Sequence, residues 1–436
     1  MTDTIQLEAL KGLVSSKTGI LRRVERRPTS ADEPPIPILY DGQLSNFDFK
    51  NVDAIERASC GKNVTDAAAQ IGAIGEAIEH YCAYHPNVQN LKRAAIEDVE
   101  GAVSPEEFVL FSEAQYSSPG FKFARWSKES QIGWLPAREL PSRTRVWVPA
   151  SMVYLNYTGD QRQDFLCPPT SSGSAAGRDL DSAIFRGLME CVERDAFMNT
   201  WLARLPAAEI DYSKLGGPCS VIRNHYARYG VDVKAYLMPT DLPVNAIMAI
   251  GFQREGDGPA AVVGLGCGLD PESALRGALF EVCQVRPAER MKQAQDEASK
   301  LNSFRDVNTL EDHAAYFIRA DHLHEMNFLT RNGKKILMED LPDHSRAAVD
   351  GDLAFIVAGL TAIGSRAFFA DITTPDLIDY PIKVVRCLAT GLQPIGFGHS
   401  SQRLGGKRLY ELPVKLGYAS KPLTEADLNP CPHPLA

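Results

Sequence analysis

Three segments of the chain combine helical periodicity with a pair of oxygen-bearing side chains, and this pattern constrains the fold more than any other feature. Apolar residues recur at helical spacing over residues 65–84, over 179–202 and from Asp270 onward, where Asp-Pro gives an N-cap followed by proline at the first helical position. The pairs, each three positions apart, are Glu76 and Glu79, Glu190 and Glu193, and Glu281 and Gln284. Side chains at i and i+3 lie on the same side of a helix. We therefore expect each helix to present two side-chain oxygens next to each other.

The segments between these helices are rich in β-branched and aromatic residues. They predict strands over residues 145–157, 231–238, 246–252, 260–265, 367–372 and 382–388. A short helix and a basic strand are expected within 1–27, before a proline-rich connector, and the charged stretch 292–326 indicates a solvated helical face. Strands and helices do not alternate strictly, which favours an α+β fold. The simplest organisation is an N-terminal segment with the connector (1–47), one large domain (48–410) and a C-terminal tail (411–436).

Composition excludes several classes of protein. Apolar residues are 44% and charged residues 23% of the chain, which is typical of a folded globular protein and excludes disorder over most of its length. The net charge of −9 argues against nucleic-acid binding. The longest apolar stretch, 353–364, is shorter than the roughly 20 residues that span a bilayer, and the N-terminus lacks a signal-peptide pattern. Nine cysteines without a CxxC pair argue against a disulfide framework and structural zinc, so we expect a cytoplasmic protein.

The acidic pairs have two interpretations, because an ExxE pair on an amphipathic helix is usually part of a solvated face. Gly72 and Gly277 favour a site instead, since glycine destabilises a helix interior and commonly marks a close approach. If the helices converge, five carboxylates meet, and like charges this close require cations. Mg²⁺ is the natural ion, because it joins carboxylates to substrate phosphates. No Walker A motif is present, but the glycine-rich runs 171–177 and 264–268 can offer backbone N–H groups to a phosphate.

Five segments together resemble a known family. Residues 61–81, 170–197 and 268–286 are similar to the three signature segments of the YcaO superfamily, and residues 145–154 and 369–398 extend the match. The resemblance covers nearly the whole chain. It implies a YcaO-type α+β fold of layered sheets and helices, in which three helices line a site for ATP and Mg²⁺. It also implies that ATP activates a backbone amide of a peptide or protein.

The resemblance assigns roles to individual residues. The implied Mg²⁺ ligands are Glu76, Glu79, Glu190, Glu193 and Glu281. The implied nucleotide ligands are Ser172, Gln284 and Arg286. Three positions depart from the family pattern: Gly72 replaces a serine, Ser172 an asparagine and His80 an arginine. Every acidic ligand is retained, so we expect metal binding to be retained.

The end of the chain indicates a subtype. Residues 430–434 (PCPHP) are similar to the PxPxP tail of D-type cyclodehydratases, the subunits that form azolines in thiazole/oxazole-modified microcins. The segment 403–406 also resembles the D-type pattern. In that subfamily the tail reaches into the active site, which makes the three prolines candidate catalytic residues: Pro430, Pro432 and Pro434. His433 is considered as a base only because it lies in the tail. Leu435 and Ala436 follow the motif, and a frayed terminus is the alternative interpretation of a proline-rich end.

The activity that the resemblance implies is ATP-dependent cyclodehydration in the biosynthesis of an antibiotic from a ribosomally made precursor peptide. Cys, Ser or Thr residues of the precursor would become thiazolines or oxazolines after phosphorylation of the backbone amide oxygen. The implied partners are the precursor peptide, an E1-like leader-binding protein and a flavin-dependent azoline dehydrogenase, and a homodimer is a further hypothesis. Two alternatives are peptide thioamidation, against which the tail argues, and a non-catalytic scaffold, against which the retained carboxylates argue.

Overall fold

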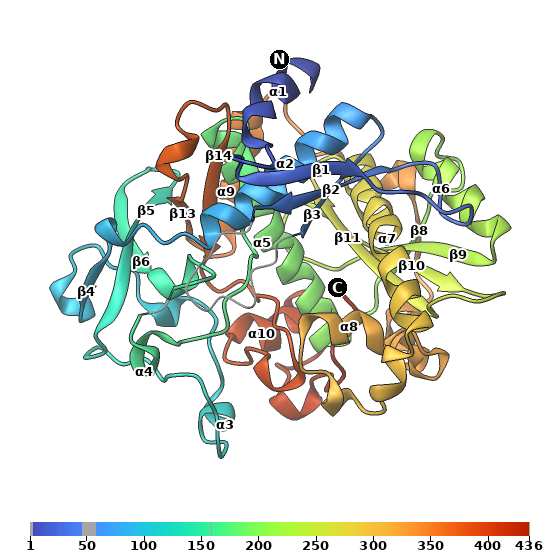
Figure 1. The fold of residues 1–436 in the computed structure, drawn as a ribbon. Coiled ribbons are helices and arrows are strands. Elements are labelled where there is room, and N and C mark those ends of the chain that lie inside the picture. Colours follow the sequence, from blue (N-terminus) through green and yellow to red (C-terminus); the bar gives the residue numbers. More distant parts are fainter. Residues whose placement is uncertain (1–2, 46–57, 158, 436) are drawn as a thin grey trace. The chain divides into compact units, whose positions relative to one another are not determined.

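The computed structural model describes residues 3–45, 58–157 and 159–435 (Figure 1). They form two compact units whose segments alternate along the chain. Unit 1 comprises Met1–Arg27, Ile38–Cys191 and Arg346–Leu392, and unit 2 comprises Pro28–Pro37, Val192–Ser345 and Gln393–Ala436. Among the described residues, unit 1 has two sheets and unit 2 has one, and each unit has its own hydrophobic core. The domain boundary predicted after residue 47 lies outside the described residues, and the predicted division at 47 and 410 stays a prediction.

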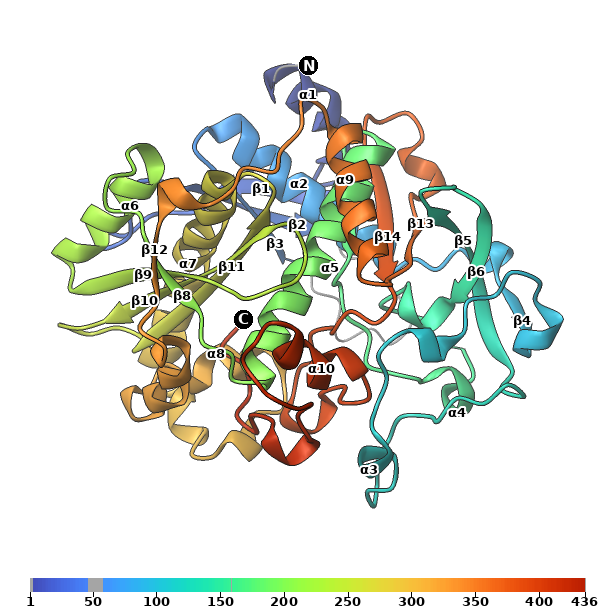
Figure 2. The ribbon, with the colours of Figure 1, turned by 180° about the vertical axis from the view of Figure 1, so that it is seen from behind.

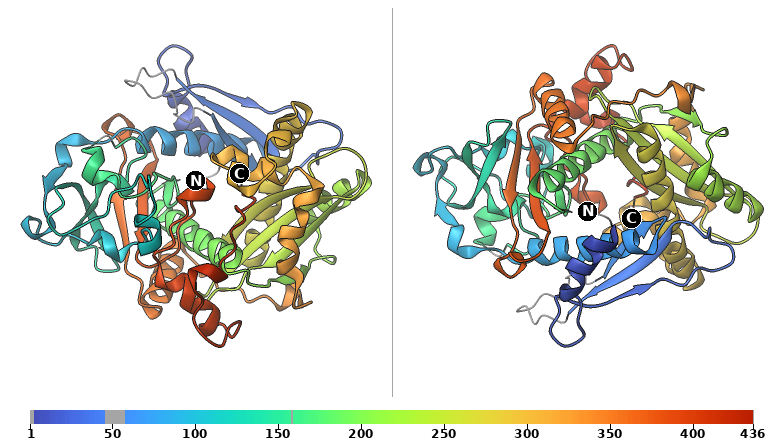
Figure 3. Two further views of the ribbon diagram at one scale, coloured as in Figure 1. Left: turned by 90° about the horizontal axis from the view of Figure 1, so that it is seen from below. Right: turned by 90° about the horizontal axis from the view of Figure 1, so that it is seen from above.

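Unit 1 contains a three-stranded antiparallel sheet with a helix packed on it. Its strands, in spatial order, are β1 (Leu21–Arg26), β2 (Ile38–Leu44) and β3 (Ala58–Asn63). Helix α2 (Asp66–Ala83) packs on β2 and β3, and α1 (Asp3–Leu10) packs on α2, as Figure 3 shows. The helix predicted over 65–84 is confirmed, as are the short helix and the basic strand near the N-terminus.

The second sheet of unit 1 is assembled from segments far apart in the sequence. Its spatial order is β4-β5-β13-β14-β7, and β6 pairs with β5. The strands are β4 (Lys92–Ala94), β5 (Ile132–Leu140), β6 (Arg145–Pro149), β7 (Ser174–Gly177), β13 (Ala367–Asp371) and β14 (Lys383–Ala389). The strand predicted over 145–157 is confirmed only as far as Pro149, because a 3-10 turn begins at Ala150. The helices of this part are α3 (Glu113–Tyr116), α4 (Gln161–Asp164) and α9 (Val349–Ala362).

Unit 2 is built on a five-stranded sheet with the order β11-β10-β9-β8-β12. Its strands are β8 (Ala208–Asp211), β9 (Val231–Leu237), β10 (Asn245–Gln253), β11 (Ala261–Gly268) and β12 (Lys335–Leu337). Helices α6 (Gly217–Arg228) and α7 (Pro271–Ala294) pack against β9, β10 and β11, and Figure 2 shows these strands from the opposite side. The predicted apolar stripe of α7 is buried completely: Leu275, Leu279 and Val282. Helices α8 (Leu310–Tyr316) and α10 (Lys407–Lys415) complete the unit.

Helix α5 (Leu180–Leu202) confirms the second predicted helix. Its predicted apolar stripe is fully buried: Ile184, Leu188, Val192 and Ala196. The helix contributes residues to both units, because the division falls between Cys191 and Val192. The mixture of mainly antiparallel sheets, in which only β8 and β12 pair in parallel among the described strands, and unevenly distributed helices is the predicted α+β class.

The prediction of a solvated helical face over 292–326 is wrong. Beyond α7 the chain forms short helical turns and α8, and His313, Ala314, Tyr316 and Phe317 are buried. Exposed charged residues of this stretch are interspersed with side chains that pack into the core. The high content of charged residues therefore led to the wrong prediction. None of the described helices is long and apolar enough to cross a membrane.

Candidate active site

The first acidic pair lies where α2 makes a close contact with β3. A Cβ atom on Gly72 would lie 3.1 Å from the Cα of Gly61, and a Cβ on Gly61 would lie 1.8 Å from the carbonyl oxygen of Ala69. Close contact between helix and strand therefore depends on glycine at both positions. Across this contact the backbone N–H of Cys60 donates to Oε2 of Glu76 at 3.4 Å. The prediction that Gly72 marks a close approach is confirmed.

Helix α7 repeats this arrangement on β11. A Cβ on Gly277 would lie 3.7 Å from the Cα of Gly266, and the N–H of Leu265 donates to Oε2 of Glu281 at 2.5 Å. In both units the residue that donates the N–H precedes its glutamate by 16 residues. The strand and the following helix therefore pair with the same residue spacing in the two units. Gly61 and Gly266 were not predicted from the sequence as the strand partners. The repeated spacing is the signal that could have identified them.

The second acidic pair begins at Glu190, which the glycine-rich loop before β7 orients. The N–H of Gly173 donates to Oε2 of Glu190 at 3.3 Å. Gly173 has a φ of 88°, a conformation that favours glycine, and a Cβ on Gly187 of α5 would lie 2.7 Å from its carbonyl oxygen. Ser172 is the neighbouring residue of this loop and is half-buried. Its role as a nucleotide ligand stays a prediction.

Unit 1 brings Glu79 close to two further carboxylates. Burial raises the pKa of Glu79 well above its usual value, and the like charges of Glu190 and Glu76 raise it further. The N–H of Ala176, which donates to Oε2 of Glu79 at 3.2 Å, and the charge of Arg386 act in the opposite direction. Three of the five predicted metal ligands thus gather in unit 1.

The chemistry of this group fits a divalent cation. Like charges that are buried together are costly unless a proton or a cation neutralises them, and carboxylate oxygens are the ligands that Mg²⁺ prefers. In the part of the chain that the structure describes, no three His, Cys, Asp or Glu side chains form a ready metal-binding group. The assignment of the five glutamates to Mg²⁺ therefore stays a prediction.

Unit 2 holds the other predicted site residues. Glu193 lies close enough to Cys267 of β11 for its charge to raise the pKa of that thiol, after the larger effect of burial. Arg194 pairs with Glu193 at 3.7 Å. On α7, Gln284 and Glu281 are both half-buried. Because the carboxylates of α2 and α7 belong to different units, their convergence on one site stays a prediction.

Arg286 is engaged by the proline-rich segment. Its side chain is 3% exposed, its guanidinium pairs with Glu33 and Asp32, and Nη2 donates to Oε1 of Gln253 at 2.9 Å. The hydroxyl of Tyr226 donates to the other oxygen of Glu33 at 2.6 Å. These contacts anchor the segment on α6 and α7. They do not support the predicted role of Arg286 in nucleotide binding, which stays a prediction.

Asp195 connects α5 to later parts of the chain. It is fully buried and accepts hydrogen bonds from Nε and Nη2 of Arg408 at 3.0 and 2.8 Å. It also accepts from the N–H of Gln393 at 2.8 Å and from Nδ2 of Asn199 at 2.9 Å. Arg408 pairs with Asp241 as well. The Asp195 carboxylate therefore holds α5, the Gln393 backbone and α10 together within unit 2, because each of them donates a hydrogen bond to it.

The last described residues of the C-terminal tail, 428–435, lie along α5 within unit 2 (Figures 1 and 2) and are buried except for Pro430. Three contacts join tail and helix: Asn429 with Leu202, Cys431 with Trp201, and His433 with Phe197. The first two are hydrogen bonds of 2.7 Å, and the third is an edge-on ring contact with centroids 5.4 Å apart. The contacted residues of α5 have decreasing residue numbers as the tail proceeds toward its C-terminus. The tail therefore runs antiparallel to α5, in the direction of Glu193.

The burial of the tail excludes a frayed terminus for the described residues. Pro432 and Pro434 are buried and Pro430 is exposed. Leu435 is 2% exposed, and Ala436 lies outside the described residues. A catalytic role for the three prolines stays a prediction.

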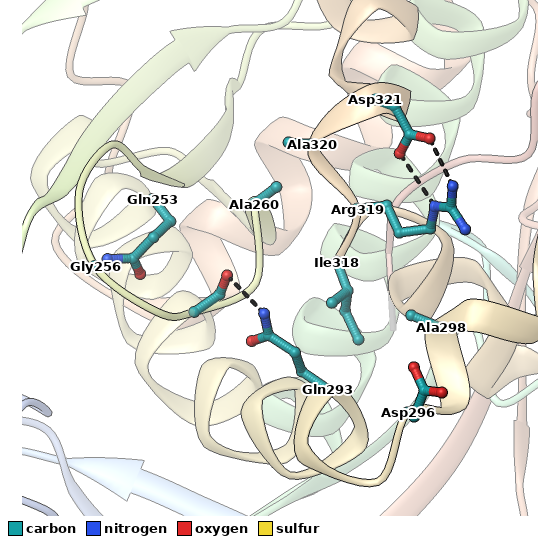
Figure 4. A pocket seen from close by; sticks show the side chains of 11 residues that line it. Gln253, Gly256, Ala260, Gln293, Asp296, Ala298, Ile318, Arg319, Ala320 and Asp321 are labelled. Carbon is teal, nitrogen blue, oxygen red and sulfur yellow. Dashed lines mark hydrogen bonds and ion pairs between the residues drawn. The ribbon is translucent and has the colours of Figure 1, made fainter.

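Unit 2 also contains a pocket of about 540 Å³ (Figure 4). It is lined by the turn around Gly256, by the end of α7 near Gln293, and by residues 318–321. Arg319 and Asp321 pair with each other on its wall, and Nε2 of Gln293 donates to the Gly258 carbonyl. None of the predicted site residues lines this pocket, so it is distinct from the acidic site.

The chain matches the YcaO family, described as YcaO cyclodehydratase, ATP- and Mg²⁺-binding, over residues 60–393. The match covers most of the chain and includes all three acidic pairs. The chain therefore belongs to the YcaO cyclodehydratase family, a family of ATP-dependent enzymes whose cofactors are ATP and Mg²⁺. An uncharacterized protein of Methanothermobacter thermautotrophicus is 28% identical over 353 residues, which cover 79% of this chain and 83% of that protein.

Solved structures share the fold. A heterocyclase in complex with substrate and cofactor has a TM-score of 0.84 and 24% identity, and the match covers 100% of this chain and 58% of that chain. YcaO from Methanopyrus kandleri, bound with AMPPCP and Mg²⁺, has a TM-score of 0.65 and 19% identity, with 90% and 91% covered. The E. coli microcin synthetase McbBCD complex gives 0.61 and 14%, with 84% and 87% covered. These similarities confirm the predicted YcaO-type fold, and this chain spans little more than half of the heterocyclase chain.

Proposed function

We propose that the protein is the azoline-forming cyclodehydratase of a system that modifies a ribosomally made precursor peptide into an antibiotic. The observation that carries this proposal is the C-terminal tail, whose prolines follow the PxPxP pattern and which runs along α5 toward Glu193. The resemblance to D-type cyclodehydratases leads one to expect a tail in this place. A heterocyclase with bound substrate and cofactor has the same fold.

In the proposed reaction, the thiol or hydroxyl of a precursor Cys, Ser or Thr adds to the carbonyl carbon of the preceding residue. This addition closes the five-membered ring, and the nucleophile gives up its proton. The oxyanion that forms takes the γ-phosphoryl group of ATP, and ADP leaves. The lone pair of the amide nitrogen then expels phosphate and the nitrogen loses its proton, which forms the C=N bond of the thiazoline or oxazoline. The peptide loses one water, and ATP becomes ADP and phosphate.

The chain supplies positioning and charge neutralisation, on which phosphoryl transfer depends more than on a protein nucleophile. When bound, Mg²⁺ would neutralise phosphate charge. The proposed ligands are Glu76, Glu79, Glu190, Glu193 and Glu281, with Ser172 and Gln284 at the nucleotide. Proline fixes φ and lacks an N–H group, so Pro432 and Pro434 would hold the tail extended without competing hydrogen bonds.

We also propose that the protein acts with partners in the cytoplasm. An E1-like protein would bind the leader of the precursor, and a flavin-dependent dehydrogenase would oxidise the azolines. The shared fold with a chain of the McbBCD complex supports an assembly of several proteins. A homodimer is a further hypothesis.

The test combines phosphate release with mass spectrometry of the peptide. Purified protein, Mg²⁺, ATP, a precursor peptide and the candidate partner are incubated together. We expect loss of one water per modified residue, coupled to phosphate release and abolished by Glu190→Gln. Arg186→Gln, at an exposed position of the same helix, is the matched control and should retain activity.

Other outcomes would replace the proposal. A mass change that corresponds to exchange of oxygen for sulfur would identify peptide thioamidation. A folded protein that hydrolyses no ATP with any partner would identify a scaffold. Modification that persists in both Glu190→Gln and Glu76→Gln would show that the acidic site is not catalytic.

A further inference from the structure

Two buried histidines of unit 2 face each other near the end of the tail. His313 lies on α8 and His433 lies in the tail, with ring centroids 4.1 Å apart and planes inclined by 30°. They are 0% and 1% exposed. The proposed reaction uses neither ring, and the sequence indicated no particular role for His313.

The partners of each ring fix its protonation. The N–H of Gly398 donates to Nε2 of His313 at 2.8 Å, so the His313 proton lies on Nδ1, which donates to the carbonyl of His433 at 2.8 Å. Nε2 of His433 donates to the carbonyl of Gly396 at 3.0 Å, and Nδ1 of His433 accepts from the N–H of Leu435 at 3.4 Å. Both rings are therefore neutral, with complementary tautomers. The ring lone pair of His433, on Nδ1, already accepts from the N–H of Leu435, which argues against its role as a base.

The surroundings keep both rings in place. The ring of Phe397 lies edge-on to both imidazoles, with centroids 5.6 Å from His313 and 5.5 Å from His433. The carbonyl of Gly396 accepts a second hydrogen bond, from Nε2 of Gln402 at 2.8 Å. The two histidines thus join three segments: α8, the loop at 396–398 and the tail. Without His313, the described end of the tail would lose its hydrogen bond to α8.

We infer that His313 is a positioning residue for the C-terminal tail. It accepts a hydrogen bond from the N–H of Gly398 and donates one to the carbonyl of His433. These two bonds hold the last described residues of the tail along α5. We call the two hydrogen bonds of His313, from Gly398 and to the carbonyl of His433, the tether. The tether follows directly from these contacts. Its importance for catalysis rests on the proposed function.

Two substitutions separate the two ends of the tether. An Asn side chain can place an amide donor near the position of Nδ1, and a Gln side chain can place an acceptor near the position of Nε2. His313→Asn should therefore keep the bond to the tail and lose the bond to Gly398, whereas His313→Gln should do the reverse. His324→Gln is the matched control, because that side chain is 66% exposed.

The first readout needs no activity. Hydrogen exchange of the Leu435 amide, followed in the full-length protein, should be faster in His313→Gln and close to wild type in His313→Asn and in the control. The second readout is azoline formation. The kcat of His313→Gln should fall by up to about a hundredfold with little change in KM for ATP, since small displacements of a positioned group have effects of this size. His313→Asn should restore most of this rate.

The two readouts distinguish the possible failures. Unchanged Leu435 exchange in His313→Gln would overturn the tether. Faster exchange with an unchanged kcat would overturn the catalytic importance of tail position. If wild-type protein forms no azoline with any precursor, the proposed function fails, while the exchange experiment still decides whether His313 holds the tail.

Discussion

Nη1 of Arg286 lies 2.5 Å from Oε1 of Glu33, and this ion pair is buried between α7 and the proline-rich segment of unit 2. Arg286 is 2% exposed and Glu33 is 6% exposed. Two charges removed from water stabilise a fold little when they are paired, but either one is costly when its partner is missing. The pair therefore makes the position of residues 28–37 depend on a residue of the third signature segment.

The first prediction concerns this pair. Glu33→Ala should lower the free energy of unfolding by about 3–5 kcal/mol, because it leaves the Arg286 guanidinium buried without its nearest carboxylate. Replacing both residues by leucine should cost less than Glu33→Ala alone. Urea denaturation of the three proteins measures these differences. Asp232→Ala, which removes an exposed pair with Arg254, is the control and should cost less than about 1 kcal/mol.

A further variant, Arg286→Lys, tests the predicted role of Arg286 in nucleotide binding. If Arg286 is structural, Arg286→Lys should destabilise the protein and leave KM for ATP of the remaining folded enzyme unchanged. A large increase in KM with unchanged stability would contradict the structural role and support the predicted contact with phosphate.

The second prediction concerns Glu79. Glu79→Gln removes one of three neighbouring carboxylates, so the metal-free protein should become more stable, with Tm rising by about 2–4 °C for each ~1 kcal/mol gained. The same variant should lose most of the stabilisation that Mg²⁺ and ATP give to the wild type. Thermal unfolding with and without Mg²⁺ and ATP measures both effects. Glu97→Gln changes an exposed carboxylate of the same unit and should alter neither. A destabilised Glu79→Gln protein with a full response to Mg²⁺ would contradict the metal-site assignment.

The third prediction is a loss of stability in acid that depends on His313. Burial lowers the pKa of His313 from 6.5 to about 4, although the charge of Asp312 and the hydrogen bond to His433 favour the protonated ring. For His433, burial, His313 and the charge of Arg194 lower the pKa in the same direction. The unfolded chain therefore binds more protons than the folded protein over this range. Stability should fall as pH falls from about 6.5 to about 4, by at most about 3 kcal/mol for His313.

The measurement is urea denaturation across this pH range. His313→Gln should reduce the slope of stability against pH, and His324→Gln should retain the slope of the wild type. Equal slopes in all three proteins would show that His313 is not held neutral in the fold.

The three site helices were predictable because their signals are local. Apolar spacing, the Asp270 cap and Gly72 of α2 lie within their segments and are confirmed, whereas a Cβ on Gly277 of α7 would make only an ordinary contact at 3.7 Å. The sheet that contains β5, β13 and β14 joins segments more than 200 residues apart, so no local pattern shows its order. The buried tail likewise depends on distant partners, such as Trp201 for Cys431. The charged composition of residues 292–326 wrongly predicted a solvated helical face, because buried aromatic residues are interspersed among the charged ones.

The final prediction concerns the contact between α2 and β3. Gly61→Ala should destabilise unit 1 by more than about 3 kcal/mol, because its Cβ would lie 1.8 Å from the Ala69 carbonyl oxygen and 2.3 Å from the Ala73 nitrogen, and backbone atoms cannot move aside cheaply. The helix would be displaced from the strand, and the bond from Cys60 to Glu76 would be lost with it. Urea denaturation and Mg²⁺-dependent stabilisation measure the two consequences.

Two comparisons make this prediction specific to the close approach. Gly216→Ala has no atom within 4 Å of its new Cβ and should be tolerated. Gly266→Ala, at the corresponding position of β11, would meet the Ala274 carbonyl oxygen at 2.1 Å and should be as damaging to unit 2 as Gly61→Ala is to unit 1. Tolerance of alanine at both Gly61 and Gly266 would contradict the view that the close contacts of α2 with β3 and of α7 with β11 orient Glu76 and Glu281.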